Sequence, residues 1–223
     1  MQSKLLMQAI TKFLMGLAVV SMLLFLPAGT LHYWNAWLFM GVLFIPMFIA
    51  GIILLLKSPN LLEKRMNVKE KEAEQKQVIG VSLLMFAGGF IVAALDFRYS
   101  WSRLPDWVIA AAVIIFLISY GLYAEVMREN AYLSRTVEVQ ENQKVIDTGL
   151  YGIVRHPMYF VTVLLFLSIP LILGSVYAFI IFLMYPFLLV KRIKNEEAVL
   201  REALTGYEEY TKKVKYRLIP FIW

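Results

Sequence analysis

The chain has no cysteine and only two histidines, His32 and His156, among its 223 residues. Without cysteine, disulfides, catalytic thiolates and cysteine-ligated metal sites are excluded. Two histidines are too few for a zinc or haem site made of clustered imidazoles, so the sequence predicts no metal site. Charge is also scarce: Asp, Glu, Lys and Arg make up 17% of the residues, whereas an ordinary soluble domain carries about 25%.

Hydrophobic residues, by contrast, make up 60% of the chain and gather in five long blocks with almost no charge. Four of the blocks have the length that crosses a bilayer core of roughly 30 Å once. The fifth is too long for one straight helix and is interrupted by Pro170, Gly174 and Ser175, so it predicts a hairpin of two short helices, Met158–Leu173 and Val176–Val190. The five blocks are Ile10–Ala28, Trp34–Leu56, Val78–Leu95, Trp107–Met127 and Met158–Val190.

These blocks predict an all-α fold, a polytopic membrane helix bundle of four single spans and a C-terminal helical hairpin. The whole chain, 1–223, is expected to form a single membrane domain. Residues 1–127 hold the four spans, and residues 128–223 form a C-terminal region with the hairpin 158–190 and a cytosolic tail. The lack of an obvious targeting segment suits a bacterial inner membrane, although an endoplasmic reticulum protein would have the same pattern.

Lysine and arginine gather before the first block, between the second and third, after the fourth and after the hairpin. If the spans alternate in direction, these segments share one side of the membrane, and the other side keeps only Arg98 and Arg103. The positive-inside rule then places both termini in the cytoplasm. The net charge of +6 follows from this topology and favours contact with anionic membrane lipids. Nucleic-acid binding is not expected.

Two stretches on the predicted cytosolic side are long enough to build a site. The first contains two short extended runs, Thr136–Gln140 and Lys144–Ile146, that precede a turn at Gly149. The second is the tail, whose helix is expected to break near Gly206 and to resume through Tyr207–Val214.

The sequence GLYGIVRHPMY, residues 149–159, is the first motif that could carry chemistry. Pro157 suits the first turn of a helix and biases His156 away from helical dihedrals, so His156 is predicted at the helix cap with Arg155 beside it. The partial positive charge of a helix N-terminus would attract a carboxylate or phosphate there. The alternative is a topological anchor, in which the arginine, histidine and Tyr159 only mark the membrane surface.

The second motif, RIKNEE, follows the hairpin at residues 192–197. On a helix, Glu197 falls on the same face as Ile193 and Leu200, and a carboxylate in an apolar stripe requires a cationic partner. Arg192 lies four residues before Glu196 and is its expected partner. The alternative is a pair of solvated glutamates on a surface helix.

Together the motifs offer a basic corner for an anion and a partly buried carboxylate for a cation. S-adenosylmethionine, a zwitterionic amino acid joined to a nucleoside, would suit such corners, and so would other amphoteric ligands. The order GLYGIVRHPMY, apolar hairpin, RIKNEEAVL and TGYEEYTKKVKYRLIP resembles the isoprenylcysteine carboxyl methyltransferase and phospholipid methyltransferase superfamily over roughly Gln143 to Pro220.

This resemblance implies S-adenosylmethionine as cofactor and a binding site at the motif residues. The implied cofactor-binding residues are Gln143, Val145, Ile146, Gly149, Tyr151, His156, Pro157, Tyr159, Glu196 and Glu197. Arg155 also matches the family motif. The resemblance further implies that Tyr207 and Tyr210 cover the cofactor, although packing against the membrane surface is an equal alternative.

The reaction so implied is methyl transfer to a lipophilic small molecule or a lipidated substrate, with an isoprenylcysteine-like carboxylate or a lipid amine as acceptor. The predicted catalytic residues are Arg155, Arg192 and Glu197. Either arginine could orient a carboxylate, and Glu197 or Glu125 could accept the proton of an amine.

Two other functions fit parts of the sequence. A membrane reductase that uses NADPH could have a related architecture, although a dinucleotide needs more phosphate-binding arginines. A non-catalytic membrane carrier or assembly partner is the other alternative. The transport version of it is disfavoured, because charges inside the spans, which mark transport paths, are almost absent.

Overall fold

The computed structural model describes residues 2–66, 73–133 and 139–223. Within these residues the secondary structure is helical and contains no strand, so the predicted all-α class is confirmed. The elements in chain order are α1 (Gln2–Ala28), α2 (Trp34–Lys57), α3 (Pro59–Met66), α4 (Ala73–Tyr99), α5 (Asp106–Glu129), the 3₁₀ helix η1 (Gly149–Gly152), α6 (Pro157–Ile172), α7 (Val176–Phe182), α8 (Tyr185–Ala203) and α9 (Tyr207–Lys213).

Five helical segments of the described chain are long and apolar enough to cross a membrane, which agrees with a multi-pass membrane protein. Four are the predicted single spans, and the fifth is Val176–Ala203, the returning arm of the hairpin. The outgoing arm, α6, is apolar but shorter. Its return is a tight turn in which Gly174 has φ +80° and the Ser175 side chain caps α7 by accepting a hydrogen bond from the Ala178 amide.

The tail helix also follows its sequence pattern. α8 runs on from the apolar block as far as Ala203, Gly206 has φ +86°, and α9 begins at Tyr207. The predicted extended run Lys144–Ile146 has no regular secondary structure and does not pair as a strand. Most of the other predicted run, Thr136–Gln140, lies outside the described residues.

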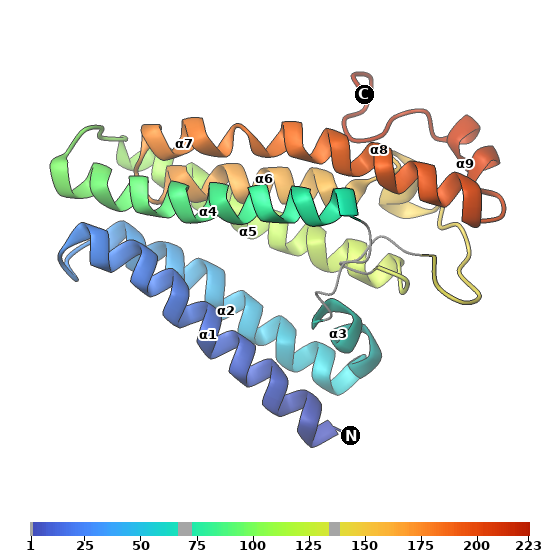
Figure 1. Ribbon diagram of the computed structural model, residues 1–223, viewed down its shortest axis with the longest axis horizontal. Coiled ribbons are helices and arrows are strands. Elements are labelled where there is room, and N and C mark those ends of the chain that lie inside the picture. Colours follow the sequence, from blue (N-terminus) through green and yellow to red (C-terminus); the bar gives the residue numbers. More distant parts are fainter. Residues whose placement is uncertain (1, 67–72, 134–138) are drawn as a thin grey trace.

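The helices form two groups that meet at one end of the molecule and diverge toward the other (Figure 1). α5 packs along α6, and α4 packs against α7 and α8, while α1 and α2 run together at an angle to them. At the joined end the Tyr33 hydroxyl donates to the Leu173 carbonyl at 2.7 Å, and Asn35 Nδ2 donates to the Ile172 carbonyl at 2.9 Å. These bonds tie the start of α2 to the hairpin turn.

Aromatic rings fill the centre of the group of helices formed by α4 to α8. Phe182 of α7 contacts Phe86 and Phe90 of α4, with ring centroids 5.2 and 6.3 Å apart. The ring lies so close to α4 that a Cβ at Gly89 would be 2.3 Å from it. Between helices in lipid, close packing of this kind replaces the hydrophobic drive that water provides elsewhere.

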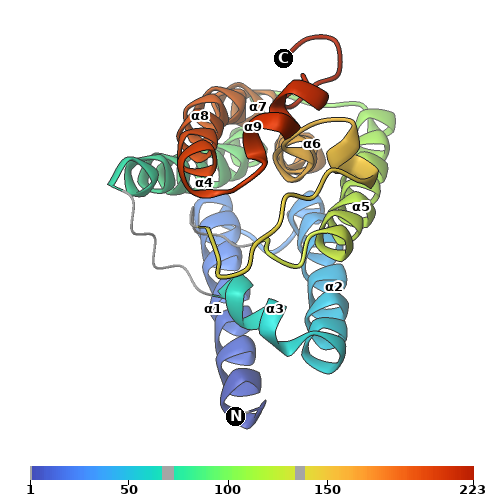
Figure 2. The same ribbon diagram turned by 90° about the vertical axis from the view of Figure 1, so that its right-hand side faces the viewer.

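The divergent end carries the segments that were predicted to build a site. Viewed from this end, α9 and the segment that precedes α6 lie across the end of α6 (Figure 2). The N-terminus, α3 and α9 lie toward the same end (Figure 1). The charge pattern predicts that this end faces the cytosol.

Candidate functional site

A cavity opens at the divergent end, between the segment that follows α5 and the helices α6, α8 and α9. Its empty volume is about 860 Å³ when the part open to solvent is included. Both sequence motifs contribute to its walls. The lining residues are Asn130, Tyr132, Leu133, Gln143, Lys144, Val145, Ile146, Tyr151, Arg155, His156, Met158, Tyr159, Arg192, Glu196, Val199, Leu200, Leu204, Tyr207 and Tyr210.

The two motifs are joined by a buried ionic cluster centred on Glu197. Arg155 Nε donates to Glu197 Oε1 at 2.7 Å, and Arg217 Nε donates to Glu197 Oε2 at 2.8 Å. His156 Nε2 lies 3.3 Å from Oε1. The Glu197 residue is only 3% exposed. Each oxygen therefore has a cationic partner, as the apolar position of this glutamate predicted.

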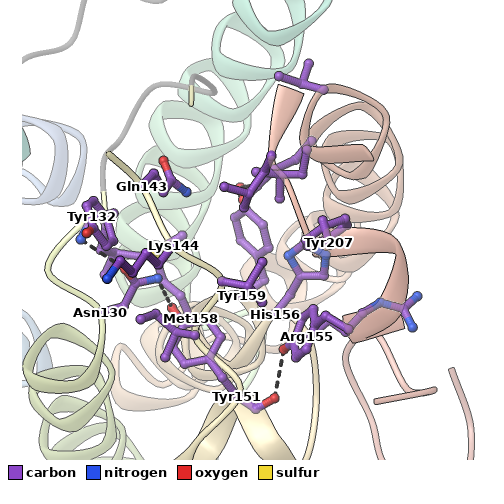
Figure 3. Close-up of a pocket in the computed structure, with 18 of the residues that line it drawn as sticks. Asn130, Tyr132, Gln143, Lys144, Tyr151, Arg155, His156, Met158, Tyr159 and Tyr207 are labelled. Carbon is purple, nitrogen blue, oxygen red and sulfur yellow. Dashed lines mark hydrogen bonds between the residues drawn. The ribbon is translucent and has the colours of Figure 1, made fainter. Parts of the chain in front are cut away.

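The tail is held against the first motif by its backbone. The Arg155 amide donates to the Tyr216 carbonyl at 2.9 Å, and the His156 amide donates to the Arg217 carbonyl at 2.8 Å. Arg155 Nη1 donates to the carbonyls of Val214 and Lys215 at 2.7 and 2.9 Å. In Figure 3 the Arg155 guanidinium accordingly extends away from Gln143 and Tyr132, toward the tail. His156 precedes α6 as predicted, but its imidazole contacts Glu197 and does not cap the helix.

A second polar group faces the cavity through Tyr159. Arg192 Nε donates to the Tyr159 hydroxyl at 2.9 Å, and this hydroxyl donates to Glu196 Oε2. The guanidinium carbon of Arg192 lies 5.9 Å from the centre of the same ring. Tyr159 thus links the predicted pair of Arg192 and Glu196, and all three side chains line the cavity.

Gly149 has a backbone role. Its φ is +52°, and a Cβ there would lie 1.4 Å from Glu129 Oε1. The same carboxylate accepts a hydrogen bond from the Leu150 amide at 3.0 Å. Only glycine lets α5 end this close to η1. This contact fixes the position of η1 and of Tyr151 within it. The Tyr151 hydroxyl accepts a hydrogen bond from Asn130 Nδ2 at 3.1 Å.

Two tyrosines of α9 close the cavity on the tail side. The Tyr210 hydroxyl donates to the Tyr151 carbonyl at 2.7 Å. The Tyr207 hydroxyl is buried and has no hydrogen-bond partner in the described part of the chain. Burial raises the pKa of both phenols, so both are neutral near pH 7. An orphaned hydroxyl in a cavity wall indicates a polar ligand atom or water as its partner.

The segment opposite α9 is ordered by its own side chains. Gln143 Oε1 accepts from the Gln140 amide at 2.8 Å, and the Tyr132 hydroxyl donates to the Asn142 carbonyl at 3.0 Å. Lys213 Nζ donates to Asp147 Oδ2 at 2.6 Å, which joins this segment to α9. The ammonium group holds the pKa of Asp147 below its usual range.

Most of the predicted site residues lie around this one cavity. Those that line it are Gln143, Val145, Ile146, Tyr151, Arg155, His156, Tyr159, Arg192 and Glu196. Gly149, Pro157 and Glu197 are not among the lining residues. Glu125, an alternative proton acceptor, forms an exposed ion pair with Arg128.

Sequence reasoning missed part of the lining. Val199 and Leu200 follow Glu196 at helical spacing, so the face of α8 that carries Glu196 could have indicated them. Asn130 and Tyr132 follow the end of α5 and had no comparable signal, because their place depends on how the segment folds back. The missed lining residues are Asn130, Tyr132, Leu133, Lys144, Met158, Val199, Leu200 and Leu204.

Comparison with known proteins supports the resemblance on which the site was predicted. The sequence model of the isoprenylcysteine carboxyl methyltransferase (ICMT) family matches residues 110–202. The match spans α5 to α8, including both motifs, and ends before the tail segment at α9. The resemblance to this family of membrane methyltransferases is therefore confirmed over that segment.

Two curated relatives carry another activity in their names. A Delta(14)-sterol reductase of Mus musculus is 30% identical over 91 residues, which are 40% of this chain and 22% of that protein. A Delta(14)-sterol reductase of Methylotuvimicrobium alcaliphilum is 25% identical over 135 residues, which are 54% of this chain and 32% of that protein. The aligned segments thus span less than a third of the length of each relative.

Proposed function

We propose that this chain, whose residues 110–202 match the isoprenylcysteine carboxyl methyltransferase family, transfers a methyl group from S-adenosylmethionine to a lipophilic acceptor at the membrane surface. The observation that carries the proposal is that both motifs wall one cavity, which is also lined by Tyr207 with its buried and unpartnered hydroxyl. The cavity is polar where Glu196 and Tyr207 lie and apolar where Leu133, Val199 and Leu200 lie.

The residues present fit the amino acid and nucleoside parts of such a cofactor. The Glu196 carboxylate can accept hydrogen bonds from an ammonium group or from ribose hydroxyls. The neutral Tyr207 hydroxyl can donate to, or accept from, a polar ligand atom. Val145 and Ile146, on the segment before α6, supply apolar surface for a purine ring. When bound, S-adenosylmethionine supplies an electrophilic methyl group on its sulfonium sulfur.

Glu197 acts as a positioning residue in this proposal. Both of its carboxylate oxygens are engaged by arginines, and it does not line the cavity. Glu197 therefore cannot take a proton from an amine substrate without breaking the cluster that holds Arg155 and the tail together. Its role is to keep Arg155 and the backbone of His156 in place as a wall of the cavity.

The charges of the lining favour a carboxylate acceptor over an amine. Lys144 and Arg192 line the cavity together with the carboxylate of Glu196, whereas the guanidinium of Arg155 is engaged by Glu197 and the tail. Arg192, which lies on α8 beside Tyr159, can orient a carboxylate with its planar guanidinium group. A carboxylate acceptor is already ionised at neutral pH and needs no general base, so the protein has only to align it with the methyl donor and exclude water.

A reductase that uses NADPH is the second candidate, because both reported relatives are named sterol reductases. The two candidates differ in the ligand they require. We expect the purified protein in detergent to be stabilised against heat by S-adenosylhomocysteine and not by NADPH. If NADPH stabilises the protein and S-adenosylhomocysteine does not, the reductase becomes the supported function in place of the methyltransferase.

A labelled-methyl assay tests the reaction itself. The protein is reconstituted with labelled S-adenosylmethionine and a total lipid extract, and products are identified by mass spectrometry. We expect the label in a lipophilic ester that mild base hydrolyses. A base-stable N-methyl product would instead identify an amine acceptor. If the protein binds S-adenosylhomocysteine in a separate experiment but labels no lipid in this assay, the result would contradict catalysis.

A further inference from the structure

The last six residues, 218–223, fold into a closed turn that we call the C-terminal hook. The Leu218 and Ile219 amides both donate to the Trp223 carbonyl, at 2.8 and 3.1 Å, and the Trp223 amide donates to the Ile219 carbonyl at 3.1 Å. Leu218 is buried in the main core, and Trp223 packs against that core. The base of the hook is therefore fixed to the helix bundle.

The tip of the hook presents apolar side chains outward. Phe221 is 87% exposed and Ile222 is 77% exposed. Phe221 also has φ +65°, a left-handed conformation in which the Cβ of a bulky residue crowds the backbone. A surface turn that needed only this backbone shape would favour glycine or asparagine. The Phe221 ring contacts the Tyr216 ring, with centroids 5.3 Å apart, but this contact leaves most of the side chain exposed. A strained phenylalanine kept at an exposed tip indicates that the free face of its ring has a contact outside the bundle.

The place of the hook identifies that contact. Viewed along the helices, the C-terminus and the loop that leads to it project outside the ring of helices (Figure 2). Viewed from the side, the C-terminus is level with α8 and does not extend beyond α9 (Figure 1). The hook is therefore at the flank of the bundle, near the end where α8 leaves its apolar block. In a membrane this flank meets the boundary between acyl chains and headgroups.

The neighbouring residues suit the same boundary. The Arg217 guanidinium carbon lies 5.4 Å from the centre of the Trp223 ring, and Lys215 is exposed. Tryptophan and basic side chains gather at the headgroup level of membrane proteins, with apolar side chains below them. We propose that the C-terminal hook inserts Phe221 and Ile222 into the membrane interface beside the bundle.

The hook would also connect the membrane surface to the cavity. It directly follows Tyr216 and Arg217, whose carbonyls accept the amides of Arg155 and His156. Insertion of the tip would hold this wall of the cavity at a set height above the acyl chains. Insertion of the hook is independent of the reaction that the cavity supports.

Spin labels can measure the depth of the hook, because the chain has no cysteine of its own that would have to be removed. Single variants Phe221→Cys and Ile222→Cys are labelled with a nitroxide in nanodiscs of phosphatidylcholine and phosphatidylglycerol. Phe187→Cys on α8, at a 76% exposed apolar position, serves as the membrane control, and Glu209→Cys on α9 serves as the water control. Collisions with oxygen and with a water-soluble nickel chelate are then compared.

We expect the labels at 221 and 222 to meet oxygen more and the nickel chelate several-fold less than the label at 209, with values between those of the two controls. Nickel collisions as frequent as at position 209 would place the hook in water and overturn the proposal. Protection from both reagents would show a protein contact, such as a second copy of the chain, and would overturn it equally.

Discussion

Arg155 and Glu197 form a hydrogen-bonded ion pair of 2.7 Å in the interior of the protein, although 42 residues separate them in the chain. Arg155 ends the loop before α6, and Glu197 lies on α8 after the hairpin has returned. Arg217 approaches the other carboxylate oxygen from the tail. One glutamate thus holds together three segments that surround the cavity, and this arrangement makes the two glutamates of the second motif unequal.

The first prediction separates these two glutamates. Glu197→Gln would leave two arginines beside a neutral side chain, and the loss of one member of a buried ion pair costs about 3 kcal/mol. We expect a large drop in the unfolding temperature and faster proteolysis of the tail. Glu196→Gln changes a partly exposed side chain in the cavity wall, so it should retain stability and weaken S-adenosylhomocysteine binding. Equal stability of the two variants would contradict the positioning role of Glu197.

The second prediction concerns the orphaned hydroxyl. Tyr207→Phe removes a buried group that has no partner in the described chain, so the free protein should be as stable as before or more stable. If the hydroxyl bonds to the ligand, affinity for S-adenosylhomocysteine should fall about fivefold, since one neutral hydrogen bond contributes about 1 kcal/mol. Isothermal titration calorimetry measures this directly.

Tyr210→Phe is the matched control, because it removes the same atom from the neighbouring tyrosine. The Tyr210 hydroxyl donates to the Tyr151 carbonyl at 2.7 Å. Its loss should lower stability by about 1 kcal/mol and leave a buried acceptor unsatisfied. If Tyr207→Phe binds S-adenosylhomocysteine with unchanged affinity, the Tyr207 hydroxyl does not contact the ligand.

The third prediction tests why residue 149 is glycine. Gly149→Ala would drive a methyl group into the Glu129 carboxylate and displace it from the Leu150 amide. The positive φ adds a cost of about 1 kcal/mol. We expect Gly149→Ala to lower the unfolding temperature in detergent, and the double variant with Glu129→Ala to recover part of the loss. No recovery would place the cause elsewhere than in the contact with Glu129.

The fourth prediction addresses the opposite end of the molecule. Asp96 is buried, and its carboxylate accepts from the Ser102 amide at 2.7 Å and from the hydroxyls of Ser102 and Ser175. Asp96→Ala would leave these donors unsatisfied at the hairpin turn, which should cost about 3 kcal/mol. Because the cavity is at the other end of the helices, the folded protein should bind S-adenosylhomocysteine as before. A change in affinity without a change in stability would contradict this structural role.

Several features of the protein were readable from local sequence. A bilayer imposes one length on any helix that crosses it, so the lengths of the apolar blocks predicted the spans and the hairpin. Pro157 predicted the start of α6, and Gly206 predicted the break before α9, because both residues restrict or permit particular backbone angles. The apolar face around Glu197 predicted that a cation would meet this carboxylate.

The tertiary structure decided which groups meet. Sequence spacing suggested Arg192 as the partner of Glu196, and the structure adds the Tyr159 hydroxyl, which bonds to both side chains. The partners of Glu197, Arg155 and Arg217, come from segments far along the chain, and helical periodicity carries no information about such contacts. For the same reason the sequence did not point to Asn130 and Tyr132 as lining residues, or to the close approach of Glu129 to Gly149. Local pattern determined the helices and the need for a counter-charge, whereas the packing of distant segments determined its source and which side chains face the cavity.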